Sequence, residues 1–453
     1  MTILDVSIVN VALPTIGKDL NFSRENLQWV VTAYALTFGG FLLLGGRAAD
    51  LLGRRRVFMV GVTLFSLASL MCGLANTEGV LIASRAVQGV GGAIISPAAL
   101  SIVSATFTEG AERNKALGIW GALGGSGAAV GVLLGGILTK YAGWEWIFFV
   151  NVPVGAIVLV VAPRIVRESR VATTERHFDP LGAVTITGGL ALLVYTLSRA
   201  PFVGWGTTRT IGLLIVAFAL IGAFLVIERT VAQPLMPFHI FRVRTVAGAN
   251  VVAALLGAVI FANFFVLTLY VQTVLGFSAL RAGVTFLATA GTAVIAAGVA
   301  QALVTRVGVK PILSLGLALL TAAMVWYTQI PTDGSYVSDL LPGYLLVGVG
   351  IAFSFVPVTI AALAGVEERE AGLASGLINT SQQIGGAIGV ALASTVFTTH
   401  IGTGRATLET LTAAYAQAFW LLAGFAAAAF VASLLLIRRE EIATVGEPHG
   451  SPT

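Results

Sequence analysis

The sequence predicts an all-α integral membrane protein with fourteen membrane-spanning helices. Of its 453 residues, 57% are hydrophobic and only 10% are charged, against roughly 25% charged in an average soluble domain. Apolar runs of about 20 residues, the length that crosses a bilayer, recur from one end of the chain to the other. The charged residues fall in short loops between these runs. Together these patterns exclude a string of soluble domains.

The apolar runs define the order of the predicted helices. The first run is short, which indicates that part of its cytoplasmic end is missing. The fourth, ninth and twelfth are long enough to tilt or to extend beyond the bilayer. The spans are expected near residues 2–17, 28–46, 57–75, 79–107, 114–138, 144–165, 181–198, 210–228, 245–275, 282–304, 309–328, 340–365, 372–398 and 413–437.

The positions of the basic residues predict the orientation. With an intracellular N-terminus, 18 of the 26 Lys and Arg residues fall on the cytoplasmic side and 7 on the outer side. Cytoplasmic loops of membrane proteins carry such an excess. We therefore expect a multi-pass protein of the cell membrane with both termini in the cytoplasm. The basic residues are topology signals, and no nucleic-acid partner is expected.

Two charged turns are similar and predict a repeated architecture. Residues 46–56 form a glycine-punctuated basic turn after the second span, and within it residues 52–55 resemble residues 307–310 after the tenth span. Transporters built from repeats show such weakly similar halves. The predicted domains are a six-helix bundle at 1–170, two additional helices at 171–240, a second six-helix bundle at 241–440 and a cytoplasmic tail at 441–453.

Glycines at four-residue spacing mark two of the predicted helices. The fifth span contains Gly127, Gly131 and Gly135, and the thirteenth contains Gly385 and Gly389. This spacing places small residues on one helix face, where another backbone can approach closely. The pattern alone favours static packing, and the charged turns add the alternative of a sliding interface.

Few ionisable residues lie inside the spans, and Asp5 and Arg85 are the clear examples. A charge at mid-bilayer costs roughly 2.5–3.5 kcal/mol, so it normally faces a cavity or a partner. Two alternatives remain open: Asp5 as a solvated charge at the interface, and Arg85 extending to the outer face. At ~1.5 Å per residue, Asp5 lies about 18 Å and Arg85 about 9 Å from the outer surface. This difference does not imply a direct ion pair, and it favours contact of Arg85 with a proton or ligand through Gln88 or through water.

The sequence contains no pattern typical of an enzyme. Its four histidines are scattered, its single cysteine, Cys72, is expected to be a small core residue, and no metal-binding cluster occurs. No phosphate-binding loop with a Gly-x4-Gly-Lys-Ser/Thr pattern is present. We therefore expect no catalytic residues, no metal and no cofactor. Transport would depend on an ion gradient, and a single intramembrane carboxylate suits protons.

Six stretches in order resemble the major facilitator superfamily, specifically its fourteen-span drug:proton antiporter branch. They are residues 4–14, 46–56, 85–92, 146–155, 270–276 and 372–379. The resemblance covers nearly the whole chain. It departs at Val132, where the antiporter motif of helix 5 usually has proline, and at Glu145, where arginine is common.

The resemblance implies roles for particular residues. Asp5 and Arg85 would couple transport to protons. The cytoplasmic gate would consist of Gly46, Asp50, Gly53, Arg54 and Arg55. Asp50 would cap the N-terminus of the thirteenth span near residues 371–372, or, in a simpler interpretation, anchor the loop by pairing with nearby arginines. The helix 5 antiporter motif would comprise Gly127, Gly131, Gly135 and Gly136.

The predicted function is proton-coupled efflux of lipophilic drugs, dyes or secondary metabolites by alternating access, performed by a monomer. A nutrient symporter of the same superfamily and a non-transporting membrane receptor or enzyme are the alternatives. Spans nine to fourteen contain no interior acidic residue, which predicts that multiply charged cations are poor substrates. Polar and aromatic residues expected to line the substrate cavity are Asn10, Gln28, Trp29, Tyr34, Gln88, Asn263, Tyr270, Gln272 and Gln382.

Overall fold

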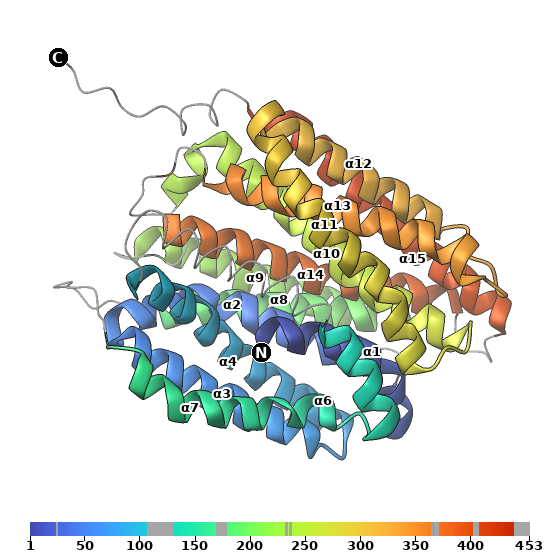
Figure 1. The fold of residues 1–453 in the computed structure, drawn as a ribbon, viewed down its shortest axis with the longest axis horizontal. Helices are drawn as coiled ribbons and strands as arrows, with labels where there is room; N and C mark the ends of the chain where they lie inside the picture. The colour runs from blue at the N-terminus through green and yellow to red at the C-terminus, as the bar shows by residue number, and fades with distance from the viewer. Residues whose placement is uncertain are drawn as a thin grey trace.

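The fold is built from α-helices, as the sequence predicted. A computed structural model describes residues 1–23, 26–106, 130–168, 179–231, 234, 238–363, 366, 371–401 and 407–438. The helices follow the predicted spans in order, with ends displaced by a few residues (Figure 1). Those before residue 231 are α1 (Thr2–Asp19), α2 (Trp29–Leu52), α3 (Arg54–Gly73), α4 (Glu78–Thr106), an unlabelled helix at Val130–Tyr141, α6 (Trp146–Phe149), α7 (Asn151–Ile165), α8 (Pro180–Val203) and α9 (Thr208–Thr230).

The remaining described helices begin after a short 3-10 turn at Phe238–Arg242. A π-helical turn at Tyr336–Leu340 leads directly into α13. These helices are α10 (Arg244–Thr273), α11 (Ala279–Val307), α12 (Val309–Tyr327), α13 (Leu341–Ala362), α14 (Ala371–Ile401) and α15 (Leu408–Leu436).

Ten helices in the described part of the chain are long and apolar enough to cross a membrane, and three shorter apolar helices accompany them. The chain is therefore a multi-pass membrane protein. Residues 107–129, which include most of the predicted fifth span, lie outside the described residues. The count of fourteen stays a prediction.

The helices pack in two neighbourhoods that meet along α2 and α14. In the lower part of Figure 1, α4 packs against α2 and α3, and α3 packs against α7. In the upper part, α10 packs against α14 and α15, and α12 packs against α13 and α15. The paired helices α8 and α9 lie beside this junction, and α8 contacts both α2 and α14.

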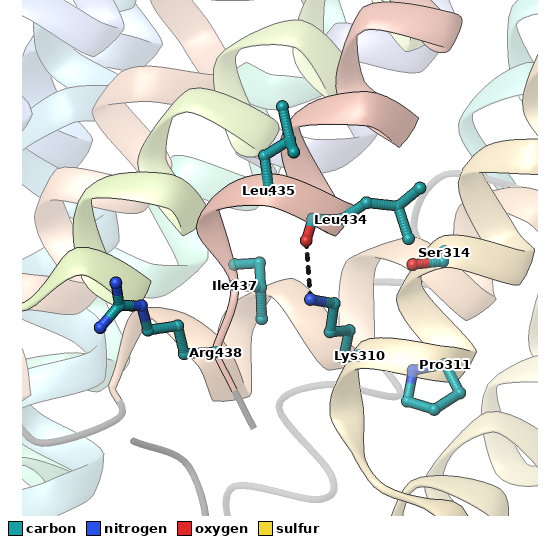
Figure 2. A pocket seen from close by; sticks show the side chains of 7 residues that line it. All are labelled: Lys310, Pro311, Ser314, Leu434, Leu435, Ile437 and Arg438. Atoms are coloured by element: carbon teal, nitrogen blue, oxygen red, sulfur yellow. Dashed lines mark hydrogen bonds between the residues drawn. The ribbon is translucent and has the colours of Figure 1, made fainter. Parts of the chain in front are cut away.

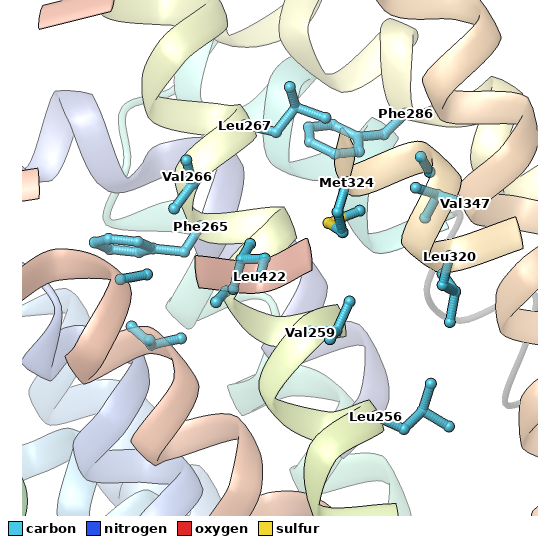
Figure 3. Close-up of a cluster of buried hydrophobic side chains, with 14 of the residues drawn as sticks. Leu256, Val259, Phe265, Val266, Leu267, Phe286, Leu320, Met324, Val347 and Leu422 are labelled. Carbon is cyan, nitrogen blue, oxygen red and sulfur yellow. The ribbon is translucent and has the colours of Figure 1, made fainter. Parts of the chain in front are cut away.

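The largest apolar cluster lies around α10. Leu267 of α10 points toward Phe286 of α11 and lies near Met324 of α12, while Phe265 of the same helix points to the opposite side (Figure 3). On the outer surface of the molecule, large apolar side chains are exposed, among them Ile295 with 73% of its surface accessible. In a membrane protein these residues face lipid.

Two glycines form the matched turns that the sequence predicted. Gly53 connects α2 to α3 at φ 110°, and Gly308 connects α11 to α12 at φ 90°. Each ends one helix and begins the next with no further residue between them. Backbone at such positive φ strains any residue with a Cβ atom, so glycine is required at both positions.

Candidate functional site

A buried ion pair between Asp5 and Arg85 is the centre of the site. Arg85 Nη1 lies 2.5 Å from Asp5 Oδ2, and the two residues are 1% and 0% exposed. Asp5 lies in the first turn of α1 and Arg85 lies two turns inside α4. Since an isolated buried charge is costly, each of these groups serves as the counter-charge of the other.

The carboxylate of Asp5 accepts two further hydrogen bonds, both to Oδ1. Gln88 Nε2 donates to it at 2.8 Å, and Asn151 Nδ2 donates at 3.1 Å from the first residue of α7. Gln88 Nε2 also donates to Ser69 Oγ at 2.6 Å, and the thiol of Cys72 lies 3.7 Å from Gln88 Oε1. Four helices therefore contribute side chains to this network.

Arg85 is held on its other sides by α2 and α6. Its Nε donates to the carbonyl of Val30 at 2.8 Å, and its Nη1 also donates to Gln88 Oε1. The guanidinium lies 4.4 Å from the ring centroid of Tyr34 and 5.7 Å from that of Phe148. A guanidinium placed over aromatic rings is attracted to their electron-rich faces. A guanidinium fixed in this way can bind the Asp5 carboxylate when it is charged and stay in place when it is neutral.

The direct ion pair contradicts the sequence-based depth estimate. That estimate took the outer ends of α1 and α4 as level and neglected the length of the arginine side chain. In the structure the carbonyl of Val11 accepts a hydrogen bond from Gln272, one residue before the end of α10. The last turns of α1 therefore extend beyond that end of α10, so the helix ends are not level throughout the structure. Contact between Arg85 and Gln88 was predicted correctly.

The network contains residues that the sequence analysis missed as site residues. Asn151 lies in a stretch that resembles a family signature. A polar amide within an apolar run could have marked it as a site residue. Ser69 and Cys72 lie on one face of α3 at three-residue spacing, and Cys72 was assigned only to the core. Tyr34 and Gln88, which were predicted to line the cavity, contact the ion pair.

The predicted gate residues lie at the turn between α2 and α3. The side chain of Asp50 is outside the described residues, so its capping role stays untested. Gly46 packs near Pro97 of α4, and Gly53 forms the turn itself. The backbone N–H groups of Arg55 and Arg56 donate to Glu168 at 3.1 and 3.2 Å.

Arg54 begins α3 with a half-buried side chain. The Arg55 side chain donates to the carbonyl of Val166 at 3.2 Å. Arg55 thus connects α3 to the segment after α7.

The glycines of the helix 5 motif approach two other helices. A Cβ atom at Gly131 would meet Ser7, and one at Gly135 would meet the backbone of Ile8, both on α1. A Cβ atom at Gly136 would meet the backbone of Leu280 on α11. Gly127 lies outside the described residues. Val132 is buried and continues the helix at the position where the motif has proline.

The other predicted cavity residues are spread along the helices. Asn10 donates to the carbonyl of Val6, Gln272 to that of Val11, and the Tyr270 hydroxyl to that of Pro331. Gln28 and Asn263 are buried, while Trp29 and Gln382 are half-buried. Two cavities, described below, are lined by other residues.

The fold and the buried ion pair define a polytopic membrane protein with a charged site between its helices. The Major Facilitator Superfamily model matches residues 1–390. The chain belongs to this superfamily, which places it among transporters rather than enzymes, as the sequence predicted.

Curated relatives and solved structures agree with this assignment. The chain is 41% identical over 401 residues to the puromycin resistance protein of Streptomyces alboniger, covering 88% of this chain and 79% of the relative. It is 37% identical over 455 residues to the cephamycin export protein of Amycolatopsis lactamdurans, covering 100% and 93%. The nucleoside transporter NupG shares the fold, with a TM-score of 0.65 at 13% identity over 96% of this chain and 98% of that structure.

Proposed function

We propose that this protein exports antibiotic-like, lipophilic small molecules across the cell membrane in exchange for protons. Relatives named for puromycin resistance and cephamycin export support the class of substrate. The observation that carries the proposed coupling is the fully buried Asp5 carboxylate, bonded to Arg85, Gln88 and Asn151. Intramembrane carboxylates paired in this way mark proton pathways in transporters.

The proposed coupling step is protonation of Asp5. A proton arriving from outside neutralises the carboxylate and removes its charge–charge attraction to Arg85. Arg85 keeps its hydrogen bond to Val30 and its contact with Tyr34, so the guanidinium stays in place while α1 is released. Loss of the proton to the cytoplasm restores the ion pair and resets the transporter.

The proposal includes the arrangement predicted from the sequence. Two six-helix bundles at 1–170 and 241–440 would rock against each other around a midplane cavity, with two additional helices at 171–240 and a cytoplasmic tail at 441–453. The chain would cross the membrane fourteen times, with both termini in the cytoplasm, and would work as a monomer without a cofactor. The turn that contains Asp50 would form the cytoplasmic gate.

Dye efflux from loaded cells tests this proposal. Cells that express the protein should expel a lipophilic dye, and an uncoupler should abolish the effect. Asp5→Asn should abolish energised efflux at equal amounts of membrane-inserted protein. Asp19→Asn is the matched control, since it removes a carboxylate from the exposed end of the same helix.

Three results would count against the proposal. Efflux by Asp5→Asn equal to that of the unaltered protein would remove Asp5 from coupling. Accumulation of solute inside right-side-out vesicles, driven by a proton gradient directed inward, would identify a symporter. The absence of any proton-coupled flux would indicate a non-transporting receptor.

A further inference from the structure

A pocket lies between the first turn of α12 and the last turn of α15, away from the Asp5–Arg85 site. Its volume is ≈ 670 Å³. Figure 2 shows Lys310 and Arg438 on either side of the last turn of α15. The end of α15 beside this pocket therefore has one cation on each of its sides. Its lining includes Lys310, Pro311, Ser314, Leu434, Leu435 and Arg438.

In the described part of the chain, the positive charge around this pocket exceeds the negative charge. Lys310 Nζ donates to the carbonyl of Leu434 at 2.7 Å, and Arg244 Nη2 donates to that of Leu435 at 3.2 Å. These carbonyls form the negative end of α15, equivalent to roughly half an elementary charge. Among the described residues, no carboxylate forms an ion pair with Lys310, Arg244 or Arg438. Among the described residues, Lys310 and Arg438 of the lining and Arg244 beside it therefore outweigh this half charge.

An apolar groove continues from the same place along the surface of α15. Its volume is ≈ 560 Å³, and it lies between α10, at Val251 and Leu255, and α15, from Ala427 to Leu436. Leu435 lines both the groove and the basic pocket and is 64% exposed. At ~1.5 Å per residue the groove extends about 13 Å along α15. Half of the hydrocarbon core of a bilayer is about 15 Å thick.

We propose that the pocket and the groove together bind an anionic glycerophospholipid. The phosphate would lie between Lys310 and Arg438, and one acyl chain would occupy the groove beside α15. An ammonium has three donors, and the bond to Leu434 uses one of those of Lys310. Basic pockets between helices at the membrane surface bind anionic headgroups. Free phosphate has no part that fits the groove, which favours the lipid as the occupant.

Native mass spectrometry of the full-length protein tests the proposal. Protein purified in detergent is titrated with phosphatidylglycerol and with phosphatidylcholine of the same acyl chains, and retained lipid is counted. We expect a preference for phosphatidylglycerol. Lys310→Gln/Arg438→Gln should reduce it by roughly fivefold for each charge removed. Arg438→Gln alone should give about half of this effect on a logarithmic scale, and it leaves the Lys310–Leu434 bond intact.

Matched variants separate the two parts of the site. Arg167→Gln/Arg306→Gln removes two exposed cations on the same predicted side of the membrane and should leave the preference unchanged. Ala428→Trp fills the groove at an exposed position and should reduce retention of lipid while the cations remain.

Four outcomes would overturn the proposal. The first is equal retention of the two lipids, and the second is an equal loss in the Arg167/Arg306 control. The third is binding of inorganic phosphate alone that displaces the lipid. The fourth is a preference that appears only after Glu440 and Glu441 are both changed to glutamine, since the tail would then be the occupant. None of these measurements depends on export, so their failure would leave the proposed function intact.

Discussion

Neutralising one partner of the Asp5–Arg85 pair should destabilise the protein far more than neutralising both. Asp5→Asn leaves the guanidinium of a 1%-exposed arginine without its counter-charge. Arg85→Gln leaves a carboxylate that keeps only the amide bonds from Gln88 and Asn151. Breaking a buried pair from one side costs about 3–5 kcal/mol, because an uncompensated charge remains buried.

The double variant Asp5→Asn/Arg85→Gln leaves no charge buried at this site. Its loss in free energy of unfolding should therefore be well below the sum of the losses in the two single variants. We expect a coupling energy of at least about 2 kcal/mol in a double-mutant cycle. Equilibrium unfolding in detergent micelles, followed by tryptophan fluorescence, measures each free energy of unfolding. The exposed neighbours Lys18 and Asp19 provide a control cycle that should show coupling near zero. Additive losses at Asp5 and Arg85 would refute the reasoning.

The same double variant separates folding from coupling. Its membrane-inserted amount should recover relative to Asp5→Asn, because no charge is left buried alone. Its energised dye efflux should not recover, because the titratable carboxylate is absent. Efflux restored together with stability would show that Asp5 serves only to fold the protein.

Three further predictions follow from individual contacts. Gly257→Val should lower the free energy of unfolding by about 1–3 kcal/mol in the same micelle assay, because a Cβ atom at this position meets the Gln382 carbonyl of α14. Gly291→Val is the control: a Cβ atom there has nothing within 4 Å, so the free energy of unfolding should change little. Glu168→Ala should lower the free energy of unfolding by about 0.5–2 kcal/mol, because two N–H groups at the start of α3 lose their acceptor. Glu145→Ala is the control, since the Glu145 side chain makes no cap hydrogen bond. A dicationic biocide should be tolerated no better by expressing cells than by empty-vector cells, and clear resistance would contradict this.

Local rules were sufficient to predict the described helices and the two tight turns between them. Apolar runs of bilayer length defined the spans, and glycine followed by a cation indicated the tight turns at Gly53 and Gly308. These features depend on neighbouring residues in the sequence, so periodicity and composition reveal them. The helix ends were less accurate: α2 continues to Leu52, where the apolar run ends near 46. Its last two turns include Arg47, which composition alone assigned to a loop.

The contacts of the site could be predicted only in part, because they depend on how far each helix slides along its neighbours. Asp5 and Arg85 were recognisable as isolated charges in apolar helices. Their direct contact was not, because the offset between α1 and α4 is set by side chains that meet in three dimensions. Asn151 joins the carboxylate from 146 residues away in the sequence. No periodic pattern in the sequence reveals a contact between residues so far apart.

Helix α1 connects the charged site to the other half of the molecule. Asp5 binds Arg85 of α4, and six residues later the carbonyl of Val11 accepts a hydrogen bond from Gln272 of α10. At ~1.5 Å per residue these two contacts are about 9 Å apart along one rigid helix. Gly131 and Gly135 lie against the same helix and allow close approach without interlocking side chains. A change in the charge of Asp5 therefore alters the force on α1. This helix is hydrogen-bonded to α4 and α10, while the glycines of the helix at Val130–Tyr141 pack against it without interlocking side chains. A displacement of α1 that begins at Asp5 would reach the junction with α10 through the helix itself, and under the proposed function this link would let protonation of Asp5 change how the two proposed bundles meet.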